Sequence, residues 1–512
     1  MPDLGFGELA ERNCIGVKRA IASLVLLWTL GGFLQAGTAA AARGAPARTS
    51  VLLLISHRSA ALDRFVAGVS DPASPLYRHF LTIEQLEQRF GPSGSAERTV
   101  ARWLRVHHLN DRLGPTRTYV DVSLTAAQKR VLFPGGTVAQ AGSRSNGLAV
   151  PPPLAGAVSA VINGRARIPG APSTAQTDSG ALAASEGFNP QGSSVRPRTG
   201  TPLGCHAGVH AGTPRLAELD LQGFTPNQYL TAYGFPRLIR QDLRGDGERI
   251  AVVEFGGFRS SDVATFARCF SLPMPHLKVI PVLTPRPLPP LDETTLDLEV
   301  LAAAAPRATS IDVYEGAPST AEGFAAAIAQ PLLARSRRPN VESISYGICE
   351  PNFAGQVPVL RVVNTVLEFE AAAGISVFAS SGDTGSTDCS LKQNSEALPV
   401  RAVGFPASSP YVAAVGGLNF TLTHRNRLAS ELVWNNSPLG FGAGGGGTSL
   451  LFDRPSWQAV PGAASVMREV PDVAMLADNA PGYAIYCTPP ACPDAGETTR
   501  GWLPVGGTSA AA

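Results

Sequence analysis

The sequence predicts an α/β protein in which a small α+β domain precedes a larger domain built on a parallel sheet with helices on both faces. The chain has 512 residues, more than the roughly 100 to 200 residues of one ordinary domain. A stretch rich in Gly, Ala, Ser and Pro, at about 135–213, divides two regions of periodic apolar residues. Beyond Phe224, short β-branched runs alternate with helical segments, which is typical of a parallel sheet.

The first residues have the pattern of an export signal, which we assign to residues 1–42. Lys18 and Arg19 precede an apolar run from Ala20 to Phe33, and small residues follow up to Ala42. The alternative is a membrane anchor, but roughly 14 apolar residues fall short of the about 20 that a spanning helix needs. We therefore expect a secreted, extracellular protein that makes no membrane contact once the signal is cleaved.

The first domain is predicted to span residues 43–163. Its apolar residues recur at helical spacing in two segments and alternate at strand spacing in others. The expected strands and helices are Val51–Ile55, Ala60–Val69, Ala96–Leu109, Thr118–Leu124 and Ala155–Ile162. Residues 164–213 contain too few large apolar side chains to order themselves, so they are predicted to be a cleavable linker.

The second domain is predicted to span residues 214–512. Its expected strands are Ile250–Phe255, Ser310–Tyr314, Val341–Ser345, Ile375–Ala379 and Tyr411–Val415. Helices are expected at Ser319–Leu333 and Val359–Ala373. Because active sites of such sheets lie at the carboxyl ends of the strands, catalytic residues are to be sought there.

Charge and cysteine content restrict the function further. The 42 basic and 40 acidic residues nearly balance, so we expect no nucleic-acid partner. Six cysteines follow the signal, and an even count in an exported chain favours disulfides. Cys487 and Cys492 form the easiest pair, across a short Pro-rich loop, and the other pairings stay open.

A glycine-rich turn near the end of the chain presents a candidate nucleophile, Ser509. In Gly506-Gly507-Thr508-Ser509-Ala510, the serine follows tight-turning glycines and precedes helix formers. At a helix start, backbone N–H groups favour a developing negative charge; the alternative is an ordinary capping serine. A serine nucleophile needs a base, yet His276 and His424, the histidines past the linker, lie in polar loops and are expected at the surface.

Two carboxylic acids, Glu293 and Asp297, offer a different base. They are four residues apart on a predicted helix and share its apolar face with Val300, Leu301 and Ala304. Buried acids this close must share protons, which suits a base with an orienting acid behind it. The alternative is a solvated acidic helix; the opposite face is expected to turn Asp292, Thr295 and Glu299 to solvent.

A third acid, Asp383, lies on the turn Ser380–Gly385 directly after a predicted strand. A protonated carboxyl there could donate a hydrogen bond to the oxyanion of a tetrahedral intermediate. The alternative is a plain Asp turn between glycines.

The order of these residues along the chain resembles that of the sedolisins, the serine-carboxyl peptidases with a subtilisin-like fold. The residues in question are Glu293, Asp297, Asp383 and Ser509. Other blocks resemble that family's recurrent segments: Phe224–Pro226 with Tyr233, Ile250–Gly257, Ser343–Gly347, Phe405–Pro410, Val415–Gly417, Pro455–Gln458 and Val470–Ala474. The first domain is similar to the family's pro-kumamolisin-type activation domain, for which we expect a ferredoxin-like fold, in Ser70–Tyr77, Leu81-Thr82 and Trp103-Leu104.

The resemblance implies a role for each residue. Ser509 would be the nucleophile, Glu293 the general base and later acid, Asp297 its partner and Asp383 the oxyanion donor. Glu254, at the end of its strand, would extend the carboxyl network behind Glu293. Tyr346 stands where the family usually has Trp.

The implied function is that of a secreted, acid-active, monomeric serine peptidase made as a zymogen, with its own activation domain as an intramolecular inhibitor. It would cleave protein or peptide substrates through an acyl-enzyme, as an endopeptidase or a tripeptidyl peptidase. A carboxyl of pKa about 4.3 is still partly ionised near pH 4, whereas an imidazole of pKa about 6.5 is charged. Activity is therefore expected to peak below about pH 6.

The resemblance also implies what lies beyond Ala512. In the family, the serine opens a long central helix, and a later segment carries a calcium site, so calcium is expected with ligands beyond this residue. The peptidase domain is thus expected to lack its C-terminal part and to be unstable or inactive alone, because that helix buries apolar area. Two alternatives stay open: a non-catalytic secreted binding or scaffold protein, and a histidine-dependent subtilisin.

Overall fold

The computed structural model describes residues 48–134, 147–168, 223–284, 287–317, 320–353, 356–387, 401–437, 442–459, 465–479, 481–492 and 501–512. All of them fall within one compact unit, Ala47–Ala512. The expected signal peptide and most of the expected linker lie outside the described residues, as do Cys205 and Cys389. The domain boundaries drawn from the sequence therefore remain predictions.

The amino-terminal module, residues 48–168, contains a five-stranded antiparallel sheet in the order β2-β3-β1-β5-β4. Three helices connect β1 to β2 and one follows β3, which is the βαββαβ arrangement of a ferredoxin-like fold, as predicted. Helices α2 and α4 were not expected from the sequence. The elements are β1 Arg48–Ile55, α1 Ser59–Ser70, α2 Ile83–Phe90, α3 Gly94–Val106, β2 Asn110–Leu113, β3 Tyr119–Thr125, α4 Ala126–Leu132, β4 Gly147–Leu148 and β5 Val158–Asn163.

The second module, residues 223–512, is built on a sheet whose strands β7, β8, β6, β9, β11, β13 and β17 are parallel neighbours in that order. Strand β14 forms an antiparallel hairpin with the end of β13. The predicted parallel sheet is confirmed. Its strands are β6 Arg249–Glu254, β7 Leu277–Pro281, β8 Ser310–Glu315, β9 Val341–Ile344, β11 Ser376–Ser380, β13 Ala413–Leu422, β14 Leu428–Val433 and β17 Val473–Leu476.

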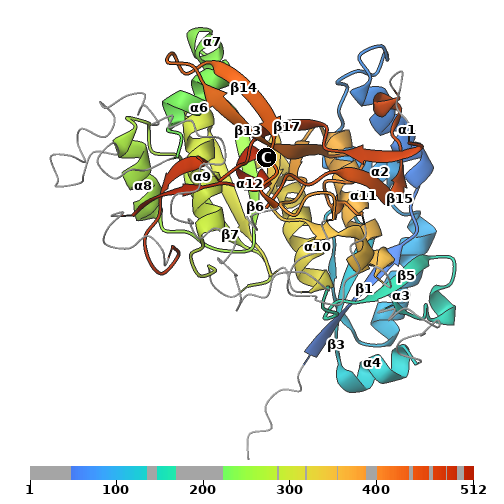
Figure 1. Cartoon of the computed structure of the whole chain (residues 1–512). Helices are drawn as coiled ribbons and strands as arrows, with labels where there is room; N and C mark the ends of the chain where they lie inside the picture. Colours follow the sequence, from blue (N-terminus) through green and yellow to red (C-terminus); the bar gives the residue numbers. More distant parts are fainter. Residues whose placement is uncertain are drawn as a thin grey trace, which may run out of the picture. The chain divides into compact units, whose positions relative to one another are not determined.

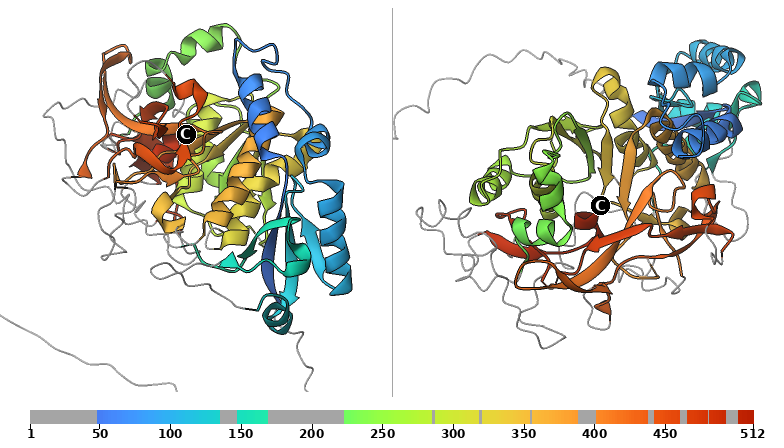
Figure 2. Two further views of the ribbon diagram at one scale, coloured as in Figure 1. Left: turned by 90° about the vertical axis from the view of Figure 1, so that its right-hand side faces the viewer. Right: turned by 90° about the horizontal axis from the view of Figure 1, so that it is seen from above.

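Helices cover both faces of this sheet (Figures 1 and 2). Along β6, Ile250 and Val252 pack against α8 and α9, whereas Val253 packs in the cluster that includes α10 and α11. This two-residue alternation is why the strands are apolar throughout. The helices are α6 Pro226–Ala232, α7 Phe235–Arg240, α8 Ser260–Cys269, α9 Asp292–Ala304, α10 Ala321–Ala329, α11 Val357–Ala373 and α12 Thr508–Ala511.

Short strands outside the main sheet complete the second module. They pair two by two, β10 with β12, β15 with β16 and β18 with β19. Their bounds are β10 Ile348–Cys349, β12 Gly404–Phe405, β15 Gly447–Asp453, β16 Met467–Val470, β18 Tyr483–Tyr486 and β19 Trp502–Val505.

Helix α9 corrects one expectation. Thr295 and Glu299, expected to face solvent, are both fully buried. The helix is enclosed by α8, α6 and β18, so its second face is covered as well. Glu299 accepts a hydrogen bond of 2.8 Å from the Tyr486 N–H, which satisfies part of the buried carboxylate.

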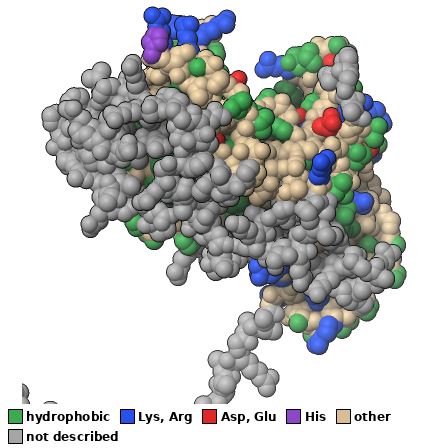
Figure 3. All heavy atoms as spheres, viewed as in Figure 1, with side chains coloured by type: hydrophobic (Ala, Val, Ile, Leu, Met, Phe, Trp, Pro, Cys, Tyr) green, Lys and Arg blue, Asp and Glu red, His purple; other side chains and the backbone are tan. Residues whose placement is uncertain are grey.

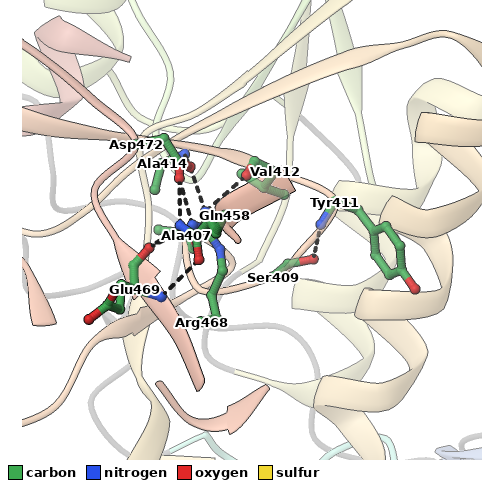
Figure 4. A network of polar contacts seen from close by, with 9 residues as sticks. All are labelled: Ala407, Ser409, Tyr411, Val412, Ala414, Gln458, Arg468, Glu469 and Asp472. Atoms are coloured by element: carbon green, nitrogen blue, oxygen red, sulfur yellow. Dashed lines mark hydrogen bonds and ion pairs between the residues drawn. The ribbon is translucent and has the colours of Figure 1, made fainter. Parts of the chain in front are cut away.

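A buried arginine joins the strands at the edge of the sheet (Figure 4). Arg468, in β16, is fully buried and pairs with Asp472, with Nη1–Oδ1 and Nη2–Oδ2 distances of 2.6 and 2.5 Å. Its guanidinium also donates to the Val412 carbonyl, at 3.2 Å. Asp472 in turn accepts from the Ala414 N–H at 2.8 Å, so the network ties β16, β13 and the start of β17 together.

The expected pairing of Cys487 with Cys492 is confirmed. Cys269 and Cys349 are also disulfide-bonded. In the described ranges no helix is long and apolar enough to cross a bilayer. On the face shown in Figure 3, Lys and Arg side chains lie in small separate groups, in keeping with a net charge of +2.

Candidate active site

The carboxyl ends of β6, β9 and β11 bring the candidate residues to one edge of the sheet. Glu254 is the last residue of β6, and Ser345 and Ser381 directly follow β9 and β11. Since Glu254 lies two residues after Val252, it shares the sheet face that packs against α9. Helix α9 carries Glu293 and Asp297 in its first two turns, next to these strand ends.

Three carboxyl groups occupy the space between β6, β9 and α9. Glu254 is fully buried and Asp297 is 4% exposed. The two carboxyls share a hydrogen bond, and Glu254 also accepts from Thr294 Oγ1 at 3.0 Å. One oxygen each of Glu254, Asp297 and Glu293 is buried without a hydrogen-bond partner among the described residues.

Burial raises the pKa of all three acids, and repulsion by neighbouring charges raises it further for Glu293 and Glu254. Desolvation is the largest cause in each case. The charge of Asp297 raises the pKa of Glu293 and Glu254 further. The pKa of Asp297 is raised only to about 7, because Ser345 and Glu254 donate hydrogen bonds to it. The three acids therefore titrate jointly; from the sequence, joint titration was predicted for Glu293 and Asp297.

Ser509 lies in the first turn of α12 and is 9% exposed. Its hydroxyl is 3.4 Å from the carbonyl oxygen of Ser345. The same hydroxyl interacts with the Glu293 carboxyl, which lowers the pKa of that acid. A hydrogen bond between the Ser509 hydroxyl and the Glu293 carboxyl is the contact that a nucleophile and its base would make.

Asp383 approaches the same turn from β11. Its Oδ1 accepts hydrogen bonds from the Thr508 N–H at 2.7 Å and from Thr508 Oγ1 at 2.8 Å. Burial raises the pKa of Asp383, and both Thr508 donors oppose the rise. The charge of Asp383 also raises the pKa of Glu293, so the two acids lie close enough to interact.

Two residues of this site were not singled out as site residues from the sequence. Ser345 donates to Asp297, and its carbonyl also accepts from Ser380 Oγ at 2.8 Å. Thr508 contacts Asp383 twice. Ser345 could have been found from its position at the carboxyl end of a predicted strand, but nothing in the pattern around Thr508 separates it from an ordinary helix start.

Tyr346 follows Ser345 and lies close enough to the three acids for their charges to act on its hydroxyl. Burial raises the pKa of its hydroxyl, and the charges of Glu293 and Glu254 raise it further. Its ring packs edge to face against Phe255, with centroids 4.8 Å apart. An apolar ring beside the acids lowers the local dielectric constant and so strengthens the interaction between their charges.

A cavity of about 160 Å³ reaches Ser509 and Asp297. Side chains of α6 and of the far end of α9, among them Tyr229 and Val300, make its walls largely apolar. His276 and His424 are both exposed, as expected, and neither contacts this site. No group of three or more His, Cys, Asp or Glu side chains in the described ranges is placed to hold a metal ion.

Comparisons with known proteins show which proteins the chain is similar to. Residues 38–151 match the family described as "Pro-kumamolisin, activation domain". The chain is 37% identical to kumamolisin of Bacillus sp. (strain MN-32) over 304 residues, which make up 56% of this chain and 50% of kumamolisin. It is 28% identical to tripeptidyl-peptidase 1 of Rattus norvegicus over 413 residues, 78% of this chain and 64% of that protein.

Among solved structures, Pseudomonas sedolisin, a serine-carboxyl proteinase, aligns with a TM-score of 0.47 and 25% identity, covering 56% of this chain and 77% of that one. In the sequence alignment described above, the chain spans about half the length of kumamolisin. Residues 38–151 match a pro-kumamolisin activation domain, and the chain aligns with kumamolisin and tripeptidyl-peptidase 1, so it is similar to the sedolisin-type serine-carboxyl peptidases, as the sequence motifs predicted.

Proposed function

We propose that this protein is a serine-carboxyl peptidase, exported as a zymogen, in which Glu293 activates Ser509. The observation that supports the proposal most strongly is the hydrogen bond between the Ser509 hydroxyl and the Glu293 carboxyl. The neighbouring acids Asp297 and Glu254 are both buried. A solvated acidic helix would leave these carboxyls in water with ordinary pKa values. Kumamolisin and tripeptidyl-peptidase 1, which are similar to this chain, support the same class of reaction.

In the proposed reaction, Ser509 Oγ attacks the carbonyl carbon of the scissile bond while Glu293 takes the hydroxyl proton. Negative charge develops on the carbonyl oxygen, and the neutral carboxyl of Asp383 donates a hydrogen bond to it. Glu293 then passes its proton to the leaving amine, which leaves an acyl-enzyme on Ser509. Water attacks this ester with Glu293 again as base, and Ser509 is regenerated.

The proposed pH range follows from two opposite requirements. Glu293 must be ionised to act as the base. The first proton leaves the trio of Glu293, Asp297 and Glu254 more readily than the later ones, because the negative charge that remains raises the pKa of the other carboxyls. Asp383 must stay protonated, so activity is lost as the pH rises through its pKa. We expect the maximum below about pH 6.

The zymogen character rests on the activation domain at residues 38–151. We propose that it inhibits the peptidase until the segment at 164–213 is cleaved, and that residues 1–42 direct export. Substrates are proteins or peptides. Calcium remains an expectation drawn from the family, with no ligand assigned among the described residues.

A pH–activity profile of the processed protein tests the proposal, with Glu293→Gln as the key variant. We expect kcat to fall by about 10²- to 10⁴-fold, the usual contribution of a general base. The matched control is Glu299→Gln, a buried acid on the same helix whose amide oxygen can still accept the Tyr486 N–H. Undiminished activity of Glu293→Gln, or a maximum in mildly alkaline buffer, would contradict the proposal. A folded protein that binds peptides without cleaving them would point to a scaffold role.

A further inference from the structure

Thr508, the residue before the proposed nucleophile, makes an unusual pair of contacts with Asp383. Both its backbone N–H and its hydroxyl reach the same carboxyl oxygen, Oδ1, at 2.7 and 2.8 Å. The Thr508 oxygen itself accepts the Gly382 N–H at 3.1 Å. Thr508 is 1% exposed, so these contacts do not compete with bulk water.

The directions of these hydrogen bonds are fixed by chemistry. A backbone N–H can only donate, so Oδ1 accepts from Thr508 N and Thr508 Oγ1 accepts from Gly382 N. The hydroxyl has one hydrogen, and Asp383 Oδ1 is its acceptor. Both lone-pair directions of Oδ1 are then occupied, so the proton of the neutral acid belongs on the other oxygen, Oδ2.

Oδ2 faces the backbone of the glycine turn that leads to Ser509. A Cβ atom on Gly507 would come within 3.0 Å of this oxygen, and Gly507 has φ +122°, a conformation that favours glycine. A glycine at this position therefore avoids a close contact between a side chain and Oδ2 of Asp383.

We propose that Thr508 is a positioning residue: it fixes the acidic proton of Asp383 on Oδ2, the oxygen that is to donate to the oxyanion. The inference rests on the proposed function, because a hydrogen bond from Oδ2 to an oxyanion matters only if the protein is a peptidase of this kind. Thr508 itself touches no reacting atom.

The electrostatics of Asp383 agree with this role. Burial raises the pKa of Asp383, whereas the N–H and the hydroxyl of Thr508 each lower it. The ionisable group that faces Asp383 from another described element is Glu293 of α9, whose pKa is raised by the charge of Asp383. Loss of the Thr508 hydroxyl should therefore raise the pKa of Asp383 further and keep the acid protonated to higher pH.

Thr508→Val, which keeps the shape of the side chain but removes its hydroxyl, tests the inference, and Thr508→Ser restores the donor. For Thr508→Val we expect kcat to fall about tenfold with KM nearly unchanged, the effect of one hydrogen bond realised in the transition state. The alkaline limb of the pH profile should move to higher pH at the same time. Thr508→Ser should resemble the parent in both respects.

The matched control is Ser381→Ala, which removes a buried hydroxyl from the same turn. Ser381 Oγ donates to the Gly445 carbonyl at 2.7 Å rather than to Asp383. A merely structural role of Thr508 would make both variants lose activity without moving the alkaline limb, and would overturn the inference.

A second readout separates this inference from the proposed function. In the Ser509→Ala protein, ¹³C NMR titration of the Asp383 carboxyl needs no turnover. We expect its pKa to rise in Thr508→Val and to stay at the parent value in Ser381→Ala and Thr508→Ser. An unchanged pKa in Thr508→Val overturns the inference even if the parent is an active peptidase. A raised pKa supports it even if the parent cleaves nothing, in which case only the proposed function fails.

Discussion

Glu293, Asp297 and Glu254 share one buried space, so the protonation of each acid depends on the other two. Asp297 lies centrally, in contact with Glu254 and with the hydroxyl of Ser345. Glu293 is the member that reaches Ser509. A base in these surroundings is strengthened by its raised pKa, and because the three groups titrate jointly, the charge left by the first proton raises the pKa of the remaining groups.

Asp297→Asn provides a test with a defined sign. After burial, the charge of Asp297 is the largest cause that raises the pKa of Glu293. Its removal should lower that pKa and move the acid limb of the pH–activity profile to lower pH, while kcat falls because the base loses its orienting partner. Glu299→Gln, the control on the same helix, should leave the limb in place. An acid limb that moves upward, or not at all, in Asp297→Asn would refute this coupling.

At the residue scale, the spacing of residues in the sequence predicted which side chains share a helix face, but not what surrounds each side chain. The four-residue interval of Glu293 and Asp297 was sufficient to place both acids on one face of α9, and Asp383 was rightly expected on a turn after a strand. Thr295 and Glu299 were wrongly expected in solvent, because a helical pattern shows which side chains share a face and not what covers the other one. Whether Ser509, Glu293, Asp297 and Asp383 act in catalysis remains a prediction.

At the element scale, the network of Arg468 holds the edge of the sheet. Its guanidinium is buried against Asp472 and packs over the ring of Trp457, at 4.8 Å from the centroid. Strand β17 follows Asp472 and pairs with β13, so the network anchors the strand that leads towards β18, β19 and the Ser509 turn.

Arg468→Met should therefore destabilise the protein strongly. Removal of one partner from a buried ion pair leaves an uncompensated charge, and the expected loss is about 3 to 5 kcal/mol of unfolding free energy. Arg307→Met is the comparison, because Arg307 pairs with Asp242 and Asp246 at the surface, where a pair contributes about 0 to 1 kcal/mol. Urea unfolding of both variants measures the difference. Equal losses would show that Arg468 acts as an ordinary surface charge.

The parallel strands could be predicted because each is a short apolar run between helices. Helices α2 and α4 were missed because each is only one or two turns long, with half or fewer of its residues buried. Strand β13 runs from Ala413 to Leu422, well beyond the predicted Tyr411–Val415, because its second half pairs with β14 in a hairpin that a local pattern does not reveal.

At the scale of the whole molecule, the activation domain meets the second module through α1 and α11. The Tyr411 hydroxyl donates to Asp63 Oδ1 of α1, and Asp63 faces the carboxyl of Glu368 of α11. Beside them lies a cavity of about 300 Å³, to which His57 and Arg361 also contribute. The sequence could not predict this contact, since the three residues belong to no common pattern and meet only when the two modules pack.

This contact should strengthen in acid. Burial and then the charge of Asp63 raise the pKa of Glu368 from 4.5 to about 9. A carboxyl with a raised pKa contributes its full stabilisation below its ordinary pKa, and the contribution disappears as the pH rises towards about 9. Acid alone would therefore not release the activation domain at this contact.

The prediction concerns the rate at which the cleaved activation domain leaves the second module. Release should be slower in acid than in mildly alkaline buffer, and Glu368→Gln, which is always neutral, should reduce that difference. Glu350→Gln is the control, because Glu350 hydrogen-bonds Ser449 and Leu450 instead of the activation domain. Gel filtration after limited proteolysis gives the measurement. An identical pH dependence in Glu368→Gln and in the parent would exclude this role of Glu368.

Covalent labelling of Ser509 by a peptide aldehyde in acid buffer tests the central claim most directly. Mass spectrometry should find the adduct on the peptide that contains Ser509, formed rapidly in the parent and in Glu299→Gln and many times more slowly in Glu293→Gln. An adduct on another residue, or labelling of Ser509 at the same rate without the Glu293 carboxyl, would contradict the account of a glutamate-activated serine.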